Sequence, residues 1–489
     1  MKDQKDDRKE KVVEEKANAP EAAGSTRRTF LKSMTIAGIG GVVSMAVPKP
    51  AISSGDAYEA AQSATGYVTD PSAQVPVTRQ VDVVVVGGGM AGVTAAIAAA
   101  RHGMKTLIMD YFGCLGGNAT SGLVSNFCGL STSGTGKIRI ARGISQEISQ
   151  ALYDKGASTA VNATAFDPEL MKVVLDEMTT AANVKKLYYT QMVRPIMEGD
   201  TIKGVIVQNK GGRQAILAKR VLDCSGDGDV CAGAGVPYTL GDGKGTFQAT
   251  DMVFQLTNVS SSFKSSAINA TSIAAGIAAG YEITRNTCIS VSWTTPGVWW
   301  FNWAGVPWQV NATDPKQLTQ AAIDGRKVAH ELARFLKDRI AGCENAKLIA
   351  TGSKVGLRES RRVKGLHKMT ADELKTATHY PDGVGACAWP FEVVTPTGRT
   401  FIYLEGDSFY TIPYRALIPM RVQNLLMAGR FISASHEAQA SIRVMGPAMV
   451  MGQAIGTAAA LSIQRGVAPS VLKVAALQKA LQADGAFLE

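Results

Sequence analysis

The stretch that decides the fold is residues 81–110, VDVVVVGGGMAGVTAAIAAARHGMKTLIMD. It opens on a valine-rich run, which suits a strand buried on both faces of a parallel sheet. An alanine-rich helix follows to about His102, residues 106–109 read as a second strand, and Asp110 stands at its end. Between the first strand and the helix, three glycines give the spacing G-x-G-x-x-G: Gly87, Gly89 and Gly92.

Each part of this unit has a role in holding a dinucleotide. The first glycine permits the tight turn, the second lets the backbone approach a pyrophosphate, and the third lets helix and strand pack closely. The helix start, with Met90 and Ala91, presents free N–H groups and positive potential, so we expect backbone amides rather than charged side chains to hold the diphosphate. Asp110 is placed to accept hydrogen bonds from an adenosine ribose, which favours FAD or NAD over NADP. The alternative is a glycine-rich turn in an ordinary α/β protein.

The N-terminal segment, residues 1–46, differs in composition from the rest of the chain. Residues 1–24 are rich in Lys, Glu, Asp and Ala and are expected to be disordered. The sequence STRRTFLK at 25–32, followed by a mildly apolar run to Ala46, resembles a twin-arginine export signal. We therefore predict a signal region over 1–46, a linker over 47–78, and export through the twin-arginine machinery to the periplasm or cell envelope.

Composition excludes several classes of protein. The formal net charge is +10, but no long Lys/Arg run with interleaved aromatic residues supports nucleic-acid binding. No apolar stretch approaches about 18 uninterrupted residues, so no stable membrane span is expected. The seven cysteines show no Cys-x-x-Cys spacing, and Asp227 and Asp229 lack the other ligands of a calcium loop, so no metal is assigned. In an exported protein, seven cysteines permit some disulfides.

The sequence after Asp110 narrows the choice of cofactor. Residues 111–122 read YFGCLGGNATSG, which resembles the glutathione-reductase-type FAD proteins, where a Gly-Gly pair runs beside the cofactor diphosphate. The resemblance implies cofactor contacts from Gly116, Gly117 and Thr120.

A three-stranded meander is predicted further along the chain. Turns at 198–200 and 210–213 separate three candidate strands: 194–197, 202–208 and 214–218. In the FAD family such a meander leads to one more strand, here Val221-Leu222-Asp223, followed by Cys224-Ser225-Gly226. The resemblance places Val193 against the adenine and Gly226 at the cofactor.

Four blocks together resemble the family called FAD-dependent oxidoreductases. They are the opening glycine block, residues 116–122, the arginine-rich block at 356–362, and AGRFISASHEAQASIRVMGPAMVMGQAIGTAAAL at 428–461. In the last block, Gly429 is expected at the flavin. A small-residue helix from about Pro447 is expected to pack on the flavin domain and to aim its N-terminus, with Met449 and Val450, at the flavin.

The resemblance implies an α/β fold. A Rossmann-like FAD-binding domain, with a parallel sheet and the meander, is assembled from residues 79–235 and 411–470. An α+β substrate or cap domain is inserted at 236–410, and 471–489 form a C-terminal tail.

Three residues are candidates for chemistry at the flavin. His436 follows Gly429 closely and titrates near neutrality, which suits acid–base work, although a structural histidine is equally consistent with the sequence. Arg443 is suited to binding a carboxylate or stabilising reduced flavin. Arg358 either belongs to a structural arginine cluster or clamps an anionic substrate.

Five of the six tryptophans fall within residues 293–308. This cluster is interpreted either as an aromatic core or as a wall of the substrate pocket. A long helix is predicted over 315–340, interrupted at Gly325.

The sequence thus favours an exported FAD-dependent oxidoreductase. It would transfer a hydride between a small organic substrate and flavin, and exchange electrons with an envelope carrier, a quinone or oxygen. Three alternatives stay open: a respiratory reductase of an activated double bond, a non-catalytic flavin-binding electron carrier, and an NAD-dependent dehydrogenase.

Overall fold

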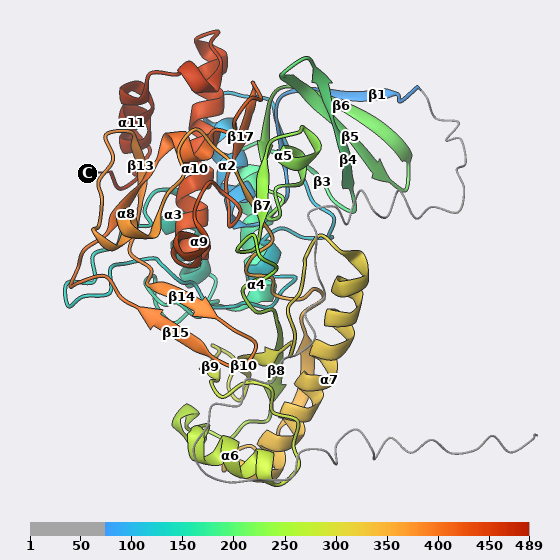
Figure 1. The fold of residues 1–489 in the computed structure, drawn as a ribbon, viewed down its shortest axis with the longest axis vertical. Helices are drawn as coiled ribbons and strands as arrows, with labels where there is room; N and C mark the ends of the chain where they lie inside the picture. The colour runs from blue at the N-terminus through green and yellow to red at the C-terminus, as the bar shows by residue number, and fades with distance from the viewer. Residues whose placement is uncertain (1–73, 489) are drawn as a thin grey trace, which may run out of the picture. The chain divides into compact units, whose positions relative to one another are not determined.

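A computed structural model describes residues 74–488 (Figure 1). The predicted signal region, and the predicted linker as far as residue 73, lie outside the described residues. The centre of the fold is a seven-stranded sheet that mixes parallel and antiparallel pairs. Its parallel strands, in spatial order, are β3 (Lys185–Leu187), β2 (Thr106–Met109), β1 (Val77–Val86), β6 (Gly212–Asp223) and β17 (Leu425–Met427). The predicted α/β class is confirmed.

Strands from both ends of the described chain meet in this sheet. β1 pairs in parallel with β2 on one side and β6 on the other, and β17 pairs with the last three residues of β6. Residues 83–85 of β1 are fully buried, as the valine run predicted. The carboxyl ends of β1, β6 and β17 therefore lie side by side, which is where open α/β sheets bind ligands.

The meander is present, with one difference from the prediction. β4 (Gln191–Glu198) and β5 (Thr201–Asn209) form antiparallel pairs, and β5 pairs with the first half of β6. The predicted strands 214–218 and 221–223 are one continuous strand. Between them, Lys219 forms an ion pair with Asp82, and Arg220 donates hydrogen bonds to Ser462 of α10 and to the Val467 carbonyl just after it.

Two long helices cross beside this sheet. α2 (Met90–Arg101) follows β1, and α10 (Met445–Gln464) packs along it. α10 is long and apolar enough by composition to cross a membrane, but 83% of its apolar window is buried inside the fold. It begins two residues before the predicted Pro447, because a proline is tolerated in the first turn, where its missing N–H has no helical partner.

A second sheet forms the lower part of Figure 1 and has its own core. Its strand order is β11 (Lys347–Thr351), β8 (Asp251–Thr257), β10 (Trp299–Gly305) and β9 (Ile289–Ser292). α7 (Pro315–Arg339) covers it and α6 (Ala270–Ala278) packs on α7. Gly325 does not interrupt α7. It lets the helix approach Met252 of β8, where a Cβ would stand only 2.8 Å from the methionine Cβ.

The buried hydrophobic side chains form two large clusters. The larger draws on residues 83–236 and 363–481, so distant parts of the chain share one core. The second lies within residues 252–357. Residues 363–410, which the sequence grouped with the substrate domain 236–410, contribute side chains to the larger cluster.

The remaining elements are short. Three two-stranded sheets pair β7 with β12, β13 with β16, and β14 with β15. Their bounds are β7 Tyr238–Leu240, β12 Arg361–Val363, β13 Gly383–Cys387, β14 Phe391–Val394, β15 Arg399–Ile402 and β16 Tyr410–Pro413. The other helices are α3 Ile144–Asp154, α4 Pro168–Ala181, α5 Asp229–Gly233, α8 Ala371–Lys375, α9 His436–Ile442 and α11 Val474–Ala483. α11, in the predicted tail, buries Leu477 and Leu481 against α10.

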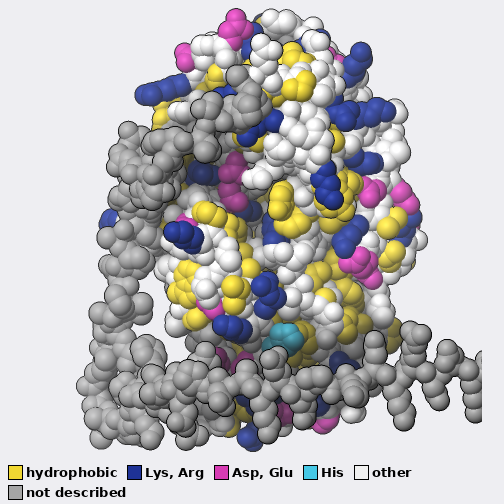
Figure 2. Space-filling model, turned by 90° about the vertical axis from the view of Figure 1, so that its right-hand side faces the viewer, with side chains coloured by type: hydrophobic (Ala, Val, Ile, Leu, Met, Phe, Trp, Pro, Cys, Tyr) yellow, Lys and Arg dark blue, Asp and Glu magenta, His cyan; other side chains and the backbone are white. Residues whose placement is uncertain are grey.

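The cysteines and the possible metal ligands can be surveyed within residues 74–488. All seven cysteines lie in the described part of the chain, where each is a free thiol. Within residues 74–488, no group of three or more His, Cys, Asp and Glu side chains is placed to hold a metal ion. On the face in Figure 2, the described Lys and Arg side chains are spread among hydrophobic and other side chains rather than gathered in one stripe.

Candidate functional site

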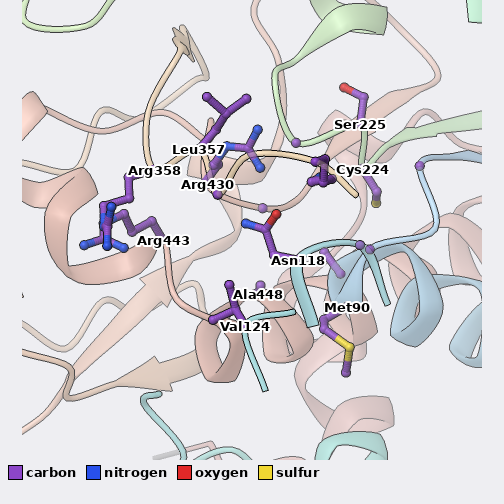
Figure 3. A pocket seen from close by; sticks show the side chains of 18 of the residues that line it. Met90, Asn118, Val124, Cys224, Ser225, Leu357, Arg358, Arg430, Arg443 and Ala448 are labelled. Atoms are coloured by element: carbon purple, nitrogen blue, oxygen red, sulfur yellow. The ribbon is translucent and has the colours of Figure 1, made fainter. Parts of the chain in front are cut away.

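One cavity of about 1120 Å³ runs between the main sheet and the second sheet. Most of the residues predicted for the site line it: Gly87, Gly89, Met90, Ala91, Asp110, Gly116, Gly117, Val193, Gly226, Gly429, Arg358 and Arg443. Gly92, Thr120, Met449, Val450 and His436 do not. Figure 3 shows Met90 and Cys224 on one side of this cavity, Asn118 near its middle, and Arg358 and Arg443 together on the other side.

The three glycines of the turn have three different surroundings. Gly87 has a positive φ of 101°, and a Cβ there would stand less than 3.0 Å from the carbonyl of Cys224. A Cβ at Gly92 would strike the carbonyl of Gly87, so this glycine closes the turn onto the helix rather than facing the cavity. At Gly89 no protein atom lies within 4 Å of an added Cβ, so the space beside its backbone is open to a ligand.

The Gly-Gly segment lies directly on this turn. The Gly116 N–H donates to the Gly88 carbonyl at 2.8 Å, and Gly89 and Gly116 form a parallel bridge. Gly116 and Gly117 both have positive φ, so glycine is required by the backbone itself. Thr120 supports the loop from behind, because its hydroxyl donates to the Leu115 carbonyl at 2.6 Å.

Asp110 stands at the end of β2 and lines the cavity. Its carboxylate accepts hydrogen bonds from the Gly88 N–H at 2.6 Å and the Phe112 N–H at 2.7 Å. Burial raises the pKa of this carboxyl, and the two backbone donors oppose that shift. The carboxylate therefore fixes the turn and still has lone pairs to offer a ligand.

The N-terminus of α10 faces the cavity one turn earlier than predicted. Val444, Met445 and Ala448 line the cavity. Met449 instead accepts a hydrogen bond on its carbonyl from the Thr94 hydroxyl at 2.8 Å, and Val450 packs against Gly385. The shift follows from the earlier start of the helix. Its positive end still faces the cavity, as the resemblance implies.

Two cations accompany the backbone amides at the glycine end. Lys354 and Arg430 both line the cavity. The Arg430 Nη2 donates to Asp227 Oδ1 at 2.6 Å, and the guanidinium lies beside Gly226, where a Cβ would meet it. Burial lowers the pKa of Lys354, and the nearby Arg430 adds to this. The glycine end of the cavity therefore offers a bound ligand two cationic side chains in addition to the predicted backbone N–H donors.

The opposite end is a chamber built around buried arginines. Arg358 bonds to the Ala249 carbonyl at 2.6 Å and pairs with Asp251, which also pairs with Arg285. The second carboxylate, Glu392, lies 3.0 Å from Arg443 Nη2 and 3.2 Å from Arg399 Nε. We call these six side chains the arginine cluster: Arg285, Arg358, Arg399, Arg443, Asp251 and Glu392.

The cluster holds both carboxylates in the ionised form. Burial raises the pKa of Asp251, but Arg358 and Arg285 outweigh it and hold the pKa at about 2. Burial also raises the pKa of Glu392, and Arg443 and Arg399 more than reverse it. Burial lowers the pKa of Arg443 to about 10, so its guanidinium is still charged at neutral pH. The chamber is therefore a region of fixed charge.

Aromatic side chains reach both sides of the second sheet. Along β10, Trp299, Phe301 and Trp303 belong to the second core, whereas Trp300 and Asn302 line the cavity. This alternation is the two-residue period of a strand. Trp299 and Trp303 therefore fit the interpretation as an aromatic core, and Trp300 lies where the interpretation as a pocket wall would require it.

His436 lies outside the cavity. It is the first residue of α9, and its Nδ1 lies 2.8 Å from Glu359 Oε1. Burial lowers the pKa of His436, but the bond to Glu359 outweighs this and raises the pKa above its ordinary value. His436 therefore forms a partly buried ion pair with Glu359 away from the cavity lining, and its acid–base role stays a prediction.

Sequence reasoning missed several residues of the cavity: Lys354, Arg399, Asp251 and Asn302. Arg399 is the first residue of the short strand β15 and belongs to no sequence motif. Asp251 did offer a signal, because it opens a strand, DMVFQLT, that has no other charged residue and is almost entirely buried. A charged residue in such a strand is costly unless it is paired.

The residues present fit an adenine dinucleotide. The open space at Gly89 takes a backbone-held diphosphate, and Asp110 and Val193 stand where the ribose and adenine would bind. The buried Asn118 Oδ1 has no hydrogen-bond partner among the described residues, although it belongs to a cavity-lining residue. The α10 N-terminus supplies positive potential at the other end.

The sequence profile described as FAD dependent oxidoreductase matches residues 82–481. The chain belongs to this family. It is an oxidoreductase enzyme, and its cofactor is FAD. The predictions of enzyme class and cofactor are therefore confirmed, and the alternatives of a non-catalytic carrier and of NAD as cofactor fall away.

One relative matches over only a part of its length. The tRNA uridine 5-carboxymethylaminomethyl modification enzyme MnmG of Alkaliphilus metalliredigens (strain QYMF) is 30% identical over 142 residues, which are 26% of this chain and 21% of that protein. The chain spans only about a fifth of that relative's length. The match therefore says nothing about this chain's substrate.

Similar solved structures have low sequence identity to this chain and TM-scores below 0.5. A geranylgeranyl bacteriochlorophyll reductase-like protein from Thermoplasma acidophilum is 13% identical, covers 83% of this chain and 84% of its own, and has a TM-score of 0.42. L-proline dehydrogenase from P. horikoshii is 12% identical, with 80% and 95% covered and a TM-score of 0.40.

Proposed function

We propose that this FAD-dependent oxidoreductase transfers a hydride between FAD and a small organic substrate bound in the chamber of the arginine cluster. The observation that carries the proposal is the continuity of one cavity, lined at one end by Gly89 and at the other by Trp300 and Arg443. Bound FAD supplies the two-electron redox chemistry. The chain supplies position, charge and shelter from water.

The positive charge of the chamber favours electron transfer from substrate to cofactor. Four arginines face two carboxylates, and the N-terminus of α10 adds its own positive potential beside Met445. These charges stabilise negative charge gained when FAD is reduced. We therefore propose a dehydrogenase direction, with electrons leaving afterwards to an envelope carrier, a quinone or oxygen.

The test is an anaerobic screen of small organic compounds against the oxidised holoenzyme. The expected result is bleaching of the oxidised-flavin absorbance by one class of compound. Reoxidation of dithionite-reduced enzyme by compounds with an activated double bond, without any bleaching in the first screen, would assign the reverse direction instead. A holoenzyme that retains FAD and responds in neither screen would contradict the proposal.

We also propose that the enzyme is exported by the twin-arginine route. The Arg27-Arg28 pair with Phe30, Leu31 and Lys32 supports this. In a host with this machinery, replacing both arginines by lysine should leave the enzyme in the cytoplasm with FAD bound, as judged by fractionation. Export of the double variant at the normal level would contradict the route.

A further inference from the structure

We propose that the substrate is an organic carboxylate, and that its acid group binds Arg399 and Arg443 in the chamber. This inference rests on the proposed function, since it names the substrate class of the same site. It starts from the charge balance. The arginine cluster holds four guanidiniums and two carboxylates, and the side chains of all six are at least nine-tenths buried. Two positive charges are therefore in excess.

An excess of buried charge is costly unless an anion compensates it. Each carboxylate of the cluster is shared by two guanidiniums, so each pair carries one positive charge in excess. In the pair that shares Asp251, Arg285 does not line the cavity and Arg358 also bonds to the Ala249 carbonyl. Arg399 and Arg443, which share Glu392, both line the cavity, so this is the pair whose excess charge a bound anion can best compensate.

Both of these cavity-lining side chains also have buried donors without a hydrogen-bond partner among the described residues; the nitrogens of Arg285 lack hydrogen-bond partners too, but Arg285 does not line the cavity. Arg443 donates only through Nη2, to the carboxylate and carbonyl of Glu392, and its Nε is buried without a partner. Arg399 has the ion pair with Glu392, but its Nη1 is likewise buried without a hydrogen-bond partner. The side chain of Arg399 is 4% exposed and that of Arg443 is 9% exposed, and both line the cavity. Planar guanidiniums with spare donors match the two oxygens of a carboxylate.

The walls of the chamber indicate the rest of the substrate. Trp300, Trp389 and Phe401 line the cavity together with these arginines. Aromatic walls favour an apolar or aromatic body next to the acid group. Asn302, whose Oδ1 is buried without a partner, adds one amide for orientation.

The test compares each acid with its neutral amide on the oxidised holoenzyme. Phenylacetate and phenylacetamide form one pair, and succinate and succinamide form the second. Binding is measured by titration of the flavin absorbance. At least one acid is expected to bind about tenfold or more tightly than its amide, since a charged hydrogen bond is lost in the amide. Equal affinities in both pairs, or no binding by either acid, would overturn the proposal.

Variants test whether Arg399 causes the tighter binding of the acid. Arg399→Gln should remove the preference for the acid, whereas Arg399→Lys should restore part of it. Arg334→Gln is the matched control, because Arg334 is an exposed arginine whose partner is Glu331 on α7. FAD content of each variant shows that the fold is retained. An unchanged acid preference in Arg399→Gln would overturn the assignment.

The two proposals fail in different ways. If a neutral compound bleaches the flavin and the acids neither bind nor compete with it, the oxidoreductase function stands and the carboxylate site falls. If the acids bind selectively and no compound exchanges electrons with the enzyme, the acid site stands and the proposed hydride transfer falls.

Discussion

Gly452 of α10 lies against the backbone carbonyl of Ala91 in α2, and a Cβ at this glycine would stand less than 3.0 Å from that oxygen. Gly456 repeats the contact one turn later, against the carbonyl of Ala95. Because backbone atoms cannot move aside cheaply, Gly452→Ala must separate the two helices. We expect it to lower the free energy of unfolding by about 1–3 kcal/mol.

Urea denaturation of the apoprotein measures this effect. Gly398→Ala is a suitable control, because the nearest atom to an added Cβ there is 3.6 Å away. If both variants lose the same small amount of stability, the close approach of α2 and α10 does not contribute as argued.

Gly89 and Gly92 separate cofactor binding from folding. No protein atom lies within 4 Å of a Cβ at Gly89, so Gly89→Leu should leave the apoprotein folded but abolish FAD retention, because its side chain fills the phosphate space. Gly92→Leu should destabilise the apoprotein itself, because its Cβ strikes the carbonyl of Gly87. FAD released on denaturation, together with apoprotein thermal unfolding, measures both. Full flavin content in Gly89→Leu would show that the turn does not hold the diphosphate.

The parts of the fold that the sequence predicted are those with local causes. β2 has the predicted bounds, since Lys105 and Asp110 enclose a short apolar run. β6 was predicted as two separate strands, and Lys219 and Arg220 lie between them. Their partners, Asp82, Ser462 of α10 and Val467, are close only in the folded chain, so no local pattern reveals them.

In the site, too, the features with local causes were predicted and those that depend on distant partners were not. The glycines of the turn at residues 87–92 were predicted correctly in their places, because the backbone geometry of such a turn requires glycine at a fixed spacing in the sequence. The arginine cluster was not predicted, because Asp251 meets Arg285 and Arg358 across 34 and 107 positions of sequence. His436 looked catalytic from its distance along the chain to Gly429. Its ring turns to Glu359 instead, a partner 77 residues away.

Asp251 gives a prediction with a defined pH range. Its pKa of about 2 in the folded protein lies below the unfolded value of about 3.9, so its contribution to stability is present above about pH 4 and is lost as the pH falls toward 2. At pH 7, Asp251→Asn leaves Arg285 and Arg358 without their shared carboxylate and should cost about 3–5 kcal/mol. Denaturation at pH 7 and near pH 3 should show the cost shrinking in acid. Asp372→Asn, at a 95% exposed side chain, is the control and should cost little at either pH.

His436 predicts the opposite trend with pH. Its pKa is raised in the folded protein through Glu359, so the protonated ring stabilises the fold. That contribution is complete below the unfolded pKa of about 6.5 and is lost as the pH rises through the higher folded pKa. His436→Gln should therefore be least stable relative to the parent at about pH 6, by about 1–3 kcal/mol, the range for a hydrogen bond to a charged group.

The difference between His436→Gln and the parent should narrow as the pH rises above the folded pKa, and FAD content should stay unchanged, because His436 does not line the cavity. Chemical denaturation at several pH values measures this, with His330→Gln on the exposed side of α7 as the control. A deficit that grows with pH would mean that His436 is not held as the charged partner of Glu359. Loss of FAD in this variant, with the fold intact, would show that His436 does act at the cofactor site.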